Sequence, residues 1–192
     1  MVTVIAGEYR LGPECGRLIL KTSRGGLAAK AGHDLTIEVT RWSAHAAVPG
    51  EDQGGLTAAS LSVEADLSSL ATREGVGGAK PLAQADRDEI DKTARQILAG
   101  RGNATATFKS SQVRTLPDGG EIEGTITIND VAQPLRLRLT EQEPGHYQGT
   151  GTIVQSAHGI KPYSALLGTL KLQDEVKLEF DADLTKARPA QE

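Results

Sequence analysis

Apolar and polar residues alternate along KAGHDLTIEV, residues 30–39. His33, Leu35, Ile37 and Val39 share one parity, and the polar residues between them share the other. Because successive side chains of a strand point to opposite faces, this period predicts a strand with one buried face and one solvent face. His33 stands in the apolar series, so its imidazole is either hydrogen-bonded for structural reasons or positioned to meet a ligand.

The apolar parity changes after this run. In RWSAHAAV, residues 41–48, the apolar set begins at Trp42 and continues at every second residue. A one-residue slip near residues 40–41, a β-bulge, accounts for the change. The slip predicts that Trp42 faces inward and that His45 faces outward.

Four later runs have the same alternation and are predicted as strands. They are SLSVEADL (60–67), EIEGTITI (121–128), PLRLRLT (134–140) and VKLEFDADL (176–184). Turn residues separate the successive runs at 49–55, 117–120, 129–130 and 143–146. Short connections of this kind join antiparallel neighbours, so we expect a meander.

Residues 71–99 interrupt the strand pattern. A glycine-rich connector, ATREGVGGAKP (71–81), leads into ADRDEIDKTARQILAG (85–100). Asp86 has the position of an N-cap with Glu89 three residues later. An apolar stripe at helical spacing follows, made of Ile90, Ala94, Ile97 and Leu98. These features predict one helix over 86–99, which Gly100 ends.

The pattern as a whole predicts an all-β fold with one helix, in which roughly eight antiparallel strands close into a barrel. The inward positions include many small residues, among them Ala44, Ala65, Gly124, Gly149 and Ala182. Small inward residues either permit tight curvature around a filled core or leave a lumen open for one small ligand.

Composition narrows the class of protein. A chain of 192 residues is expected to form a single domain, 1–192, with a polar C-terminal tail. A net charge of −4 and 3 % aromatic residues do not favour a nucleic acid as partner. The single cysteine, Cys15, excludes an internal disulfide. No apolar run is long enough to span a bilayer and no signal peptide is recognisable, so we expect no membrane span and a cytoplasmic location.

Candidate chemistry is sparse. The sequence contains no usable nucleotide-binding, hydrolase or metal motif, and its histidines, His33, His45, His146 and His158, do not have the spacing of metal ligands. His33 and Asp34 are neighbours in a strand and point to opposite faces, which argues against a dyad. A small enzyme that acts on a hydrophobic substrate, with His33 or His158 as general base, is one alternative.

The connection QSAHGIKPYSALLGTLKLQDE, residues 155–175, is unusually rich in apolar residues for a loop. Such a segment either covers the end of a core or forms a lid over a lumen. In the second case, His158 and Tyr163 would be its polar groups.

Three segments resemble the YceI-like family, the lipocalin-like polyisoprenoid-binding proteins. They are FKSSQV (108–113), IEGTITINDVAQPLRLRL (122–139) and GIKPYSALLGTLKLQDEVKLEFDADL (159–184). The strand that carries His33 and the pair Arg87 and Asp88 ahead of the helix are further similarities, and the likeness extends over about 9–184. One departure lies at 155–160, where Gln155 and His158 replace a cationic and an aromatic residue of the family.

The resemblance implies an extended eight-stranded antiparallel lipocalin-like barrel with the helix packed against it. It implies a non-enzymatic binding or carrier protein that holds a polyisoprenoid or another long apolar molecule, without cofactor or metal, and it is compatible with a homodimer. A filled barrel that acts as an interaction module is the second alternative. The expected ligand-binding residues are His33, Leu35, Ile37, Val39, Leu61, Val63, Ile126, Leu137, His158, Tyr163, Leu166 and Phe180.

Overall fold

The computed structural model describes residues 6–99 and 104–189, and within these residues thirteen strands form one antiparallel sheet. The strands are β1 (Gly7–Leu11), β2 (Gly16–Gly25), β3 (His33–Val39), β4 (Trp42–Val48), β5 (Ser60–Asp66), β6 (Leu70–Gly77), β7 (Thr105–Leu116), β8 (Gly119–Ile128), β9 (Val131–Glu143), β10 (His146–Val154), β11 (Ser164–Ala165), β12 (Leu170–Asp183) and β13 (Arg188–Pro189). The prediction of a mostly β fold is confirmed.

Helical structure in the described residues consists of α1 (Gln84–Ala99) and short 3₁₀ turns. The turns are η1 (Ala29–Ala31), η2 (Glu51–Gln53), η3 (Gly55–Ala58), η4 (Leu67–Ser69), η5 (Ser156–His158), η6 (Leu166–Gly168) and η7 (Leu184–Lys186). The single helix that the sequence predicted over 86–99 is therefore present and begins at Gln84. Gly100, which was expected to end it, lies outside the described residues.

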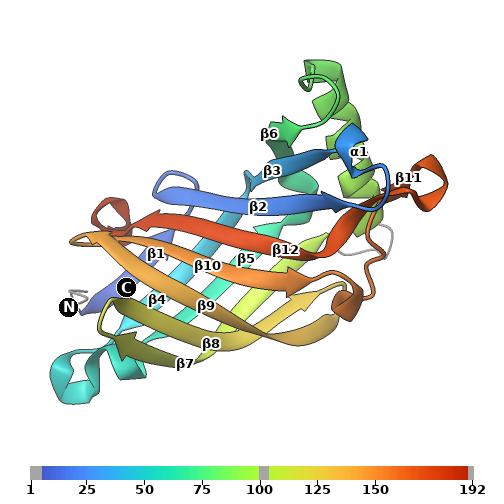
Figure 1. The fold of residues 1–192 in the computed structure, drawn as a ribbon. Helices are drawn as coiled ribbons and strands as arrows, with labels where there is room; N and C mark the ends of the chain where they lie inside the picture. The colour runs from blue at the N-terminus through green and yellow to red at the C-terminus, as the bar shows by residue number, and fades with distance from the viewer. Residues whose placement is uncertain (1–5, 100–103, 190–192) are drawn as a thin grey trace.

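The sheet curls into a half-barrel (Figure 1). Its strand order is β13-β1-β4-β5-β7-β8-β9-β10-β12-β2-β3-β6, and β11 pairs with β12. The strand count exceeds the expected eight because three runs are each broken in two and because the two-residue strands β11 and β13 are added. When β1–β2, β3–β4 and β5–β6 are counted as one run each and joined to the long strands β7, β8, β9, β10 and β12, eight runs result.

The change of parity after residue 39 is a true break in the chain's strand structure. β3 ends at Val39 and β4 begins at Trp42. Trp42 borders the interior cavity described below, and the His45 ring lies outside, 3.3 Å from a carboxylate oxygen of Glu8. Both predicted orientations are confirmed, although a break replaces the expected bulge.

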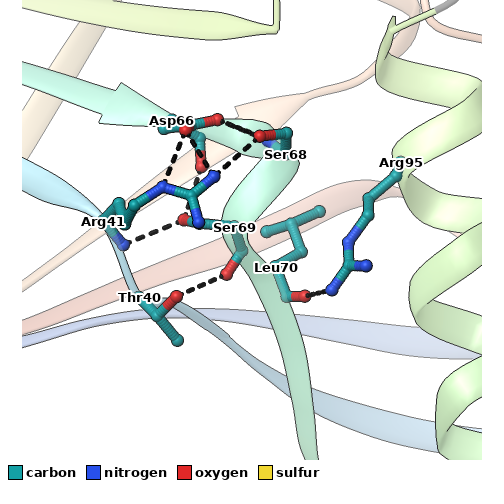
Figure 2. A network of polar contacts seen from close by, with 7 residues as sticks. All are labelled: Thr40, Arg41, Asp66, Ser68, Ser69, Leu70 and Arg95. Atoms are coloured by element: carbon teal, nitrogen blue, oxygen red, sulfur yellow. Dashed lines mark hydrogen bonds and ion pairs between the residues drawn. The ribbon is translucent and has the colours of Figure 1, made fainter.

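Polar contacts connect the junction between β3 and β4 to the neighbouring junction between β5 and β6 (Figure 2). The backbone N–H of Arg41 donates to Ser69 Oγ at 2.9 Å, and that hydroxyl donates to the carbonyl oxygen of Asp66 at 2.6 Å. The Arg41 guanidinium also binds the Asp66 carboxylate, with Nη2 2.7 Å from Oδ2. The hydrogen bonds from Ser68 and from Arg41 hold the pKa of Asp66 below its ordinary value.

The segment expected to be a connector at 71–81 contains a strand. Leu70–Gly77 is β6, paired with β3 along its whole length. Its glycines hid the strand pattern, although they allow close packing: a Cβ on Gly75 would lie 2.2 Å from Leu82 Cδ1. The prediction of a connector was therefore wrong over residues 71–77, which belong to a strand.

Two further details concern the start of α1 and the C-terminal tail. Asp86 lies within the first turn of α1 instead of at its N-cap, where Oδ2 accepts from the Ala83 N–H at 2.9 Å. The described part of the polar tail contains η7 and then β13, which pairs with β1. Residues 190–192, the end of that tail, lie outside the described residues.

The core lies on the concave face of the sheet, and α1 packs against it. The buried apolar side chains of β3, β5, β7, β8, β9 and β12 form one cluster. The helix contributes the predicted stripe to that cluster, with Ile90, Ala94, Ile97 and Leu98 packed on it. Arg95 Nη2 donates to the carbonyl oxygen of Leu70 at 2.7 Å, and this bond connects α1 to the start of β6 (Figure 2).

Candidate functional site

A cavity of about 580 Å³ occupies the space between the concave face of the sheet and α1. This volume lies within the range of roughly 300 to 1,000 Å³ that is usual for pockets that hold small molecules. The interior is therefore open, which argues against the alternative of a filled barrel.

Strand alternation supplies the wall of the cavity. Ten of the twelve residues predicted to contact a ligand line it: His33, Leu35, Ile37, Val39, Leu61, Val63, Ile126, Leu137, Tyr163 and Phe180. Those that lie in strands occur at every second position, because every second side chain of a strand faces the same side of the sheet. Contact between these residues and a ligand stays a prediction.

The helix forms a second wall. All four residues of its apolar stripe border the cavity, together with Thr93 of the same helix. Leu82, just before α1, borders it as well. Since the stripe serves both the core and the cavity, a larger side chain on this face of α1 would enter the open space.

Small residues on the concave face have two uses. A Cβ on Gly124 would lie 2.5 Å from Phe108 Cζ, and one on Gly149 would lie 2.0 Å from Phe180 Cζ, so both glycines make room for aromatic rings. Ala44, Ala65 and Ala182 border the cavity and leave it open. The sequence alone could not separate these uses, because they depend on the residue across the strand pair.

His33 lies at the mouth of the cavity. Its Nε2–H donates to the carbonyl oxygen of Lys80 at 2.8 Å, and its ring packs so closely on Gly78 that a Cβ there would be 2.3 Å from Nε2. The two hypotheses for His33 therefore combine: the ring has a backbone partner and also borders the cavity. Tyr163 stands at the same mouth and is 42 % exposed.

His158 does not reach the cavity. Its side chain is 1 % exposed, and its Nδ1–H donates to the carbonyl oxygen of Val131 at 3.0 Å. The imidazole thus anchors η5 to the start of β9, and its prediction as a ligand contact is wrong. The hydrogen bonds of His33 and His158 both go to backbone carbonyl oxygens, an arrangement unlike a catalytic base oriented by a carboxylate.

Leu166 is also placed differently from the prediction. It has a φ of 51°, and its side chain is 58 % exposed and does not border the cavity. A left-handed backbone is uncommon for leucine, and here it directs the side chain into solvent.

Thr22 is a cavity residue that the sequence reasoning missed. It borders the cavity from β2, is 8 % exposed, and its Oγ1 has no hydrogen-bond partner among the described residues. A buried hydroxyl without a partner costs free energy, so this atom favours a ligand with a polar atom. The alternation of Leu18, Leu20 and Thr22 in GRLILKTS was the signal that could have revealed it.

Charged groups border the cavity near its ends, and those at the end formed by β2 and β12 have partners. At the end formed by β2 and β12, Arg17 Nε lies 3.1 Å from a Glu38 oxygen. Partial burial opposes ionisation of Asp181, but hydrogen bonds from Gln148 and His146 outweigh it and hold the pKa of Asp181 below its ordinary value. The space between the two ends is bordered mainly by hydrocarbon.

Two kinds of feature are absent from the described part of the chain. None of its helices has both the length and the apolar character needed to cross a membrane. Nor do three or more His, Cys, Asp or Glu side chains in those residues gather as metal ligands would.

Comparisons with known proteins agree with this architecture. A family model described as the YceI-like domain matches residues 22–184. The crystal structure of Burkholderia cenocepacia BcnA is similar with a TM-score of 0.58 and 13 % identity, over 86 % of this chain and 94 % of that chain. A mutant YceI protein from Campylobacter jejuni is similar with a TM-score of 0.54 and 14 % identity, over 81 % of this chain and 85 % of that chain. At these identities, the likeness concerns the fold alone. No curated protein matches the chain.

Proposed function

The chain belongs to the YceI-like family, known as a polyisoprenoid-binding fold, and from that premise we propose that it is a non-enzymatic binding or carrier protein. Its ligand is a polyisoprenoid or another long apolar molecule, held in the cavity between the concave face of the sheet and α1. The observation that carries the proposal is the open apolar cavity of about 580 Å³.

Burial of hydrocarbon supplies the affinity in this proposal. Each methylene transferred from water to an apolar site contributes about 0.8 kcal/mol, so one five-carbon prenyl unit contributes roughly 4 kcal/mol before the costs of association. A site of this kind needs few polar residues. The shortage of chemical motifs in the sequence is therefore consistent with binding.

Two other features support binding over the alternatives. His33 and His158, the two candidate bases of the enzyme alternative, each donate a ring N–H to a backbone carbonyl oxygen, and His158 is buried away from the cavity. An interaction module would have no need of a large interior space. The homodimer and the cytoplasmic location expected from the sequence stay predictions.

Ligand extraction and a matched pair of variants test the proposal. Native mass spectrometry of the protein purified from cells, followed by organic extraction, should reveal a bound apolar molecule. In vitro, we expect farnesol to displace an apolar fluorescent reporter from the protein. Ala94→Phe, which adds a ring on the cavity face of α1, should weaken farnesol binding at least roughly tenfold, because one phenyl ring occupies about the volume of one of the three prenyl units of farnesol.

Ala85→Phe is the control, since Ala85 lies on the same helix but is exposed and does not border the cavity. Its farnesol affinity should equal that of the unmodified protein. Thermal melts of both variants show whether the helix remains folded. Equal affinities for the two variants, or no displacement of the reporter by farnesol, would contradict the proposed function.

A further inference from the structure

Three segments surround the mouth of the cavity and are called the mouth rim: 23–32, 76–83 and 156–172. Each contributes residues that border the cavity, including Gly32, Lys80 and Tyr163. Hydrogen bonds join them, since the Ala28 N–H donates to the carbonyl oxygen of Thr169 at 2.9 Å and Arg24 Nη1 donates to the carbonyl oxygen of Val76 at 3.3 Å. Figure 1 shows β11, which lies in the third segment, at the end of the molecule opposite both termini.

Large apolar side chains project from the mouth rim into solvent. Leu27 and Leu167 are fully exposed, and Leu166 is 58 % exposed. Leu27 precedes Ala28 and Leu167 lies two residues before Thr169, so the Ala28–Thr169 hydrogen bond brings the two loops together. Clustered exposed leucines are costly in water and commonly mark a binding surface.

The backbone of η6 holds its leucines in this position. Leu166 has a φ of 51° and Leu167 a φ of 55°. Left-handed backbone at two successive bulky residues is uncommon and persists only where the surrounding structure maintains it. The two leucines are thus displayed by a defined turn, which is followed directly by Gly168 at a φ of 84°.

The charge of the mouth rim contrasts with that of the whole chain. The protein carries a net charge of −4, but the three rim segments contain no Asp or Glu. Their exposed cationic residues are Lys30, Lys80, Lys161 and Lys171. In the described part of the chain these lysines make no ion pair. The rim is therefore an apolar tip within a basic ring.

Three of the carboxylates that adjoin the mouth rim accept hydrogen bonds from backbone N–H groups. Asp34 accepts from the Arg24 N–H at 2.8 Å, and Asp174 accepts from the Ser156 N–H at 2.8 Å. Asp86 accepts from the Ala83 N–H. Glu89 of α1 borders the cavity and forms an ion pair with Lys92, whose Nζ lies 3.8 Å from Glu89 Oε2.

We propose that the mouth rim docks on the surface of a membrane rich in anionic phospholipid. Leu27, Leu166 and Leu167 enter the boundary between headgroups and acyl chains, and the lysines lie over the phosphates. The cavity mouth then opens onto the lipid, so an apolar ligand can pass between membrane and cavity without crossing water. This transfer of a ligand rests on the proposed function, but docking of the protein on a membrane can be measured without any ligand.

Flotation with vesicles tests the docking directly. The ligand-free protein is mixed with vesicles of phosphatidylcholine alone or of phosphatidylcholine with phosphatidylglycerol. We expect binding to the anionic vesicles, and weaker binding as salt concentration rises because screening reduces the attraction. The double variant Leu27→Asp, Leu167→Asp should lower the partition coefficient by roughly tenfold or more, since it removes two apolar side chains from the lipid boundary.

A control separates insertion from added charge. Gln53→Asp with Ala58→Asp introduces the same two charges at exposed positions of η2 and η3, away from the mouth rim (Figure 1). This variant should bind vesicles like the unmodified protein. In a second arm, Lys30→Gln with Lys161→Gln should reduce binding to anionic vesicles by roughly fivefold per lysine and leave binding to neutral vesicles unchanged.

Three results would overturn the docking proposal. They are absence of binding to anionic vesicles, equal binding by the leucine variant and the unmodified protein, and a lipid-free dimer in sedimentation experiments that the leucine variant converts to a monomer. The last result would assign the rim to a second copy of the chain. Farnesol affinity measured without vesicles should be the same for the leucine variant and the unmodified protein, so failure of docking is distinguishable from failure of ligand binding.

Discussion

His33 Nε2 donates to the carbonyl oxygen of Lys80 at 2.8 Å, and this contact joins the first residue of β3 to the segment that precedes α1. The same imidazole borders the cavity. Because β3 belongs to the sheet and residues 76–83 belong to the mouth rim, one side chain couples the wall of the cavity to the segment at its entrance. The apolar parity of residues 33–39 predicted the inward direction of His33, but its partner could be found only in the fold.

Replacement of His33 by leucine separates the two uses of this side chain. His33→Leu removes the donor to Lys80 and adds hydrocarbon at the mouth. The lost hydrogen bond lies near the surface, where water can take its place, so we expect a decrease of about 1 kcal/mol or less in the free energy of unfolding. The apolar molecules extracted from the variant should differ in identity or amount, as mass spectrometry would show. Strong destabilisation with unchanged ligand content would contradict a binding role for His33.

The two serines after β5 provide a matched test of the contacts in Figure 2. Ser69 is 4 % exposed, accepts from the Arg41 N–H and donates to the carbonyl oxygen of Asp66. Ser69→Ala leaves both backbone groups without this partner and should lower the free energy of unfolding by about 1 to 3 kcal/mol. Ser68→Ala changes an exposed hydroxyl of the same turn and should cost less than about 1 kcal/mol. Urea denaturation of both variants measures the difference. Equal decreases in the free energy of unfolding would show that the buried Ser69 hydroxyl stabilises the fold no more than the exposed Ser68 hydroxyl does.

Asp183 provides a prediction about pH. Hydrogen bonds from Thr185 and from Lys186 lower its pKa from the ordinary 3.8 to about 2. Since the pKa is depressed in the folded state, ionised Asp183 stabilises the fold above pH 3.8, and this contribution is lost as the pH falls from about 3.8 to about 2. Titration of the Asp183 carboxyl carbon by NMR should give the low value directly.

Two variants identify the cause of that shift. Thr185→Val should raise the pKa of Asp183 more than Lys186→Met does, because the Thr185 hydrogen bond is the larger cause. Asp183→Asn identifies the resonance and should flatten the dependence of unfolding free energy on pH in the same window. An ordinary pKa for Asp183 in the unmodified protein would remove the basis of this prediction.

The sequence predicted those parts of the fold that depend on local periodicity. Alternation placed Leu35, Ile37 and Val39 on the cavity wall, and helical spacing placed Ile90 and Ala94 on the opposite one. Both predictions hold because strands and helices determine side-chain direction from the backbone alone.

The prediction failed where direction depends on distant contacts or on unusual backbone. His158 is directed by the carbonyl oxygen of Val131, 27 residues earlier in the chain, and Leu166 is turned outward by its left-handed backbone. Neither cause can be read from the loop's composition. In β6, the glycines concealed a strand that pairing with β3 maintains.

Thr22 is the residue for which the structure makes the sharpest prediction about ligand choice. Its buried Oγ1 borders the cavity and has no partner among the described residues, so it can donate to or accept from a polar atom of a ligand. Thr22→Val keeps the shape of the side chain and removes the hydroxyl. We expect farnesol affinity to fall roughly three- to tenfold, the value of one neutral hydrogen bond, and affinity for farnesene, which lacks the hydroxyl, to stay unchanged.

Stability should respond in the opposite direction to ligand affinity. Removal of an unpartnered buried hydroxyl relieves the cost of its desolvation, so the melting temperature of ligand-free Thr22→Val should equal or exceed that of the unmodified protein. Thr36→Val is the control, because Thr36 lies on the neighbouring strand β3 and does not border the cavity. Competitive titrations of farnesol and farnesene on both variants measure the selectivity. If Thr22→Val weakens both ligands equally, or neither, the hydroxyl does not recognise a polar atom of the ligand, and affinity comes from hydrocarbon burial alone.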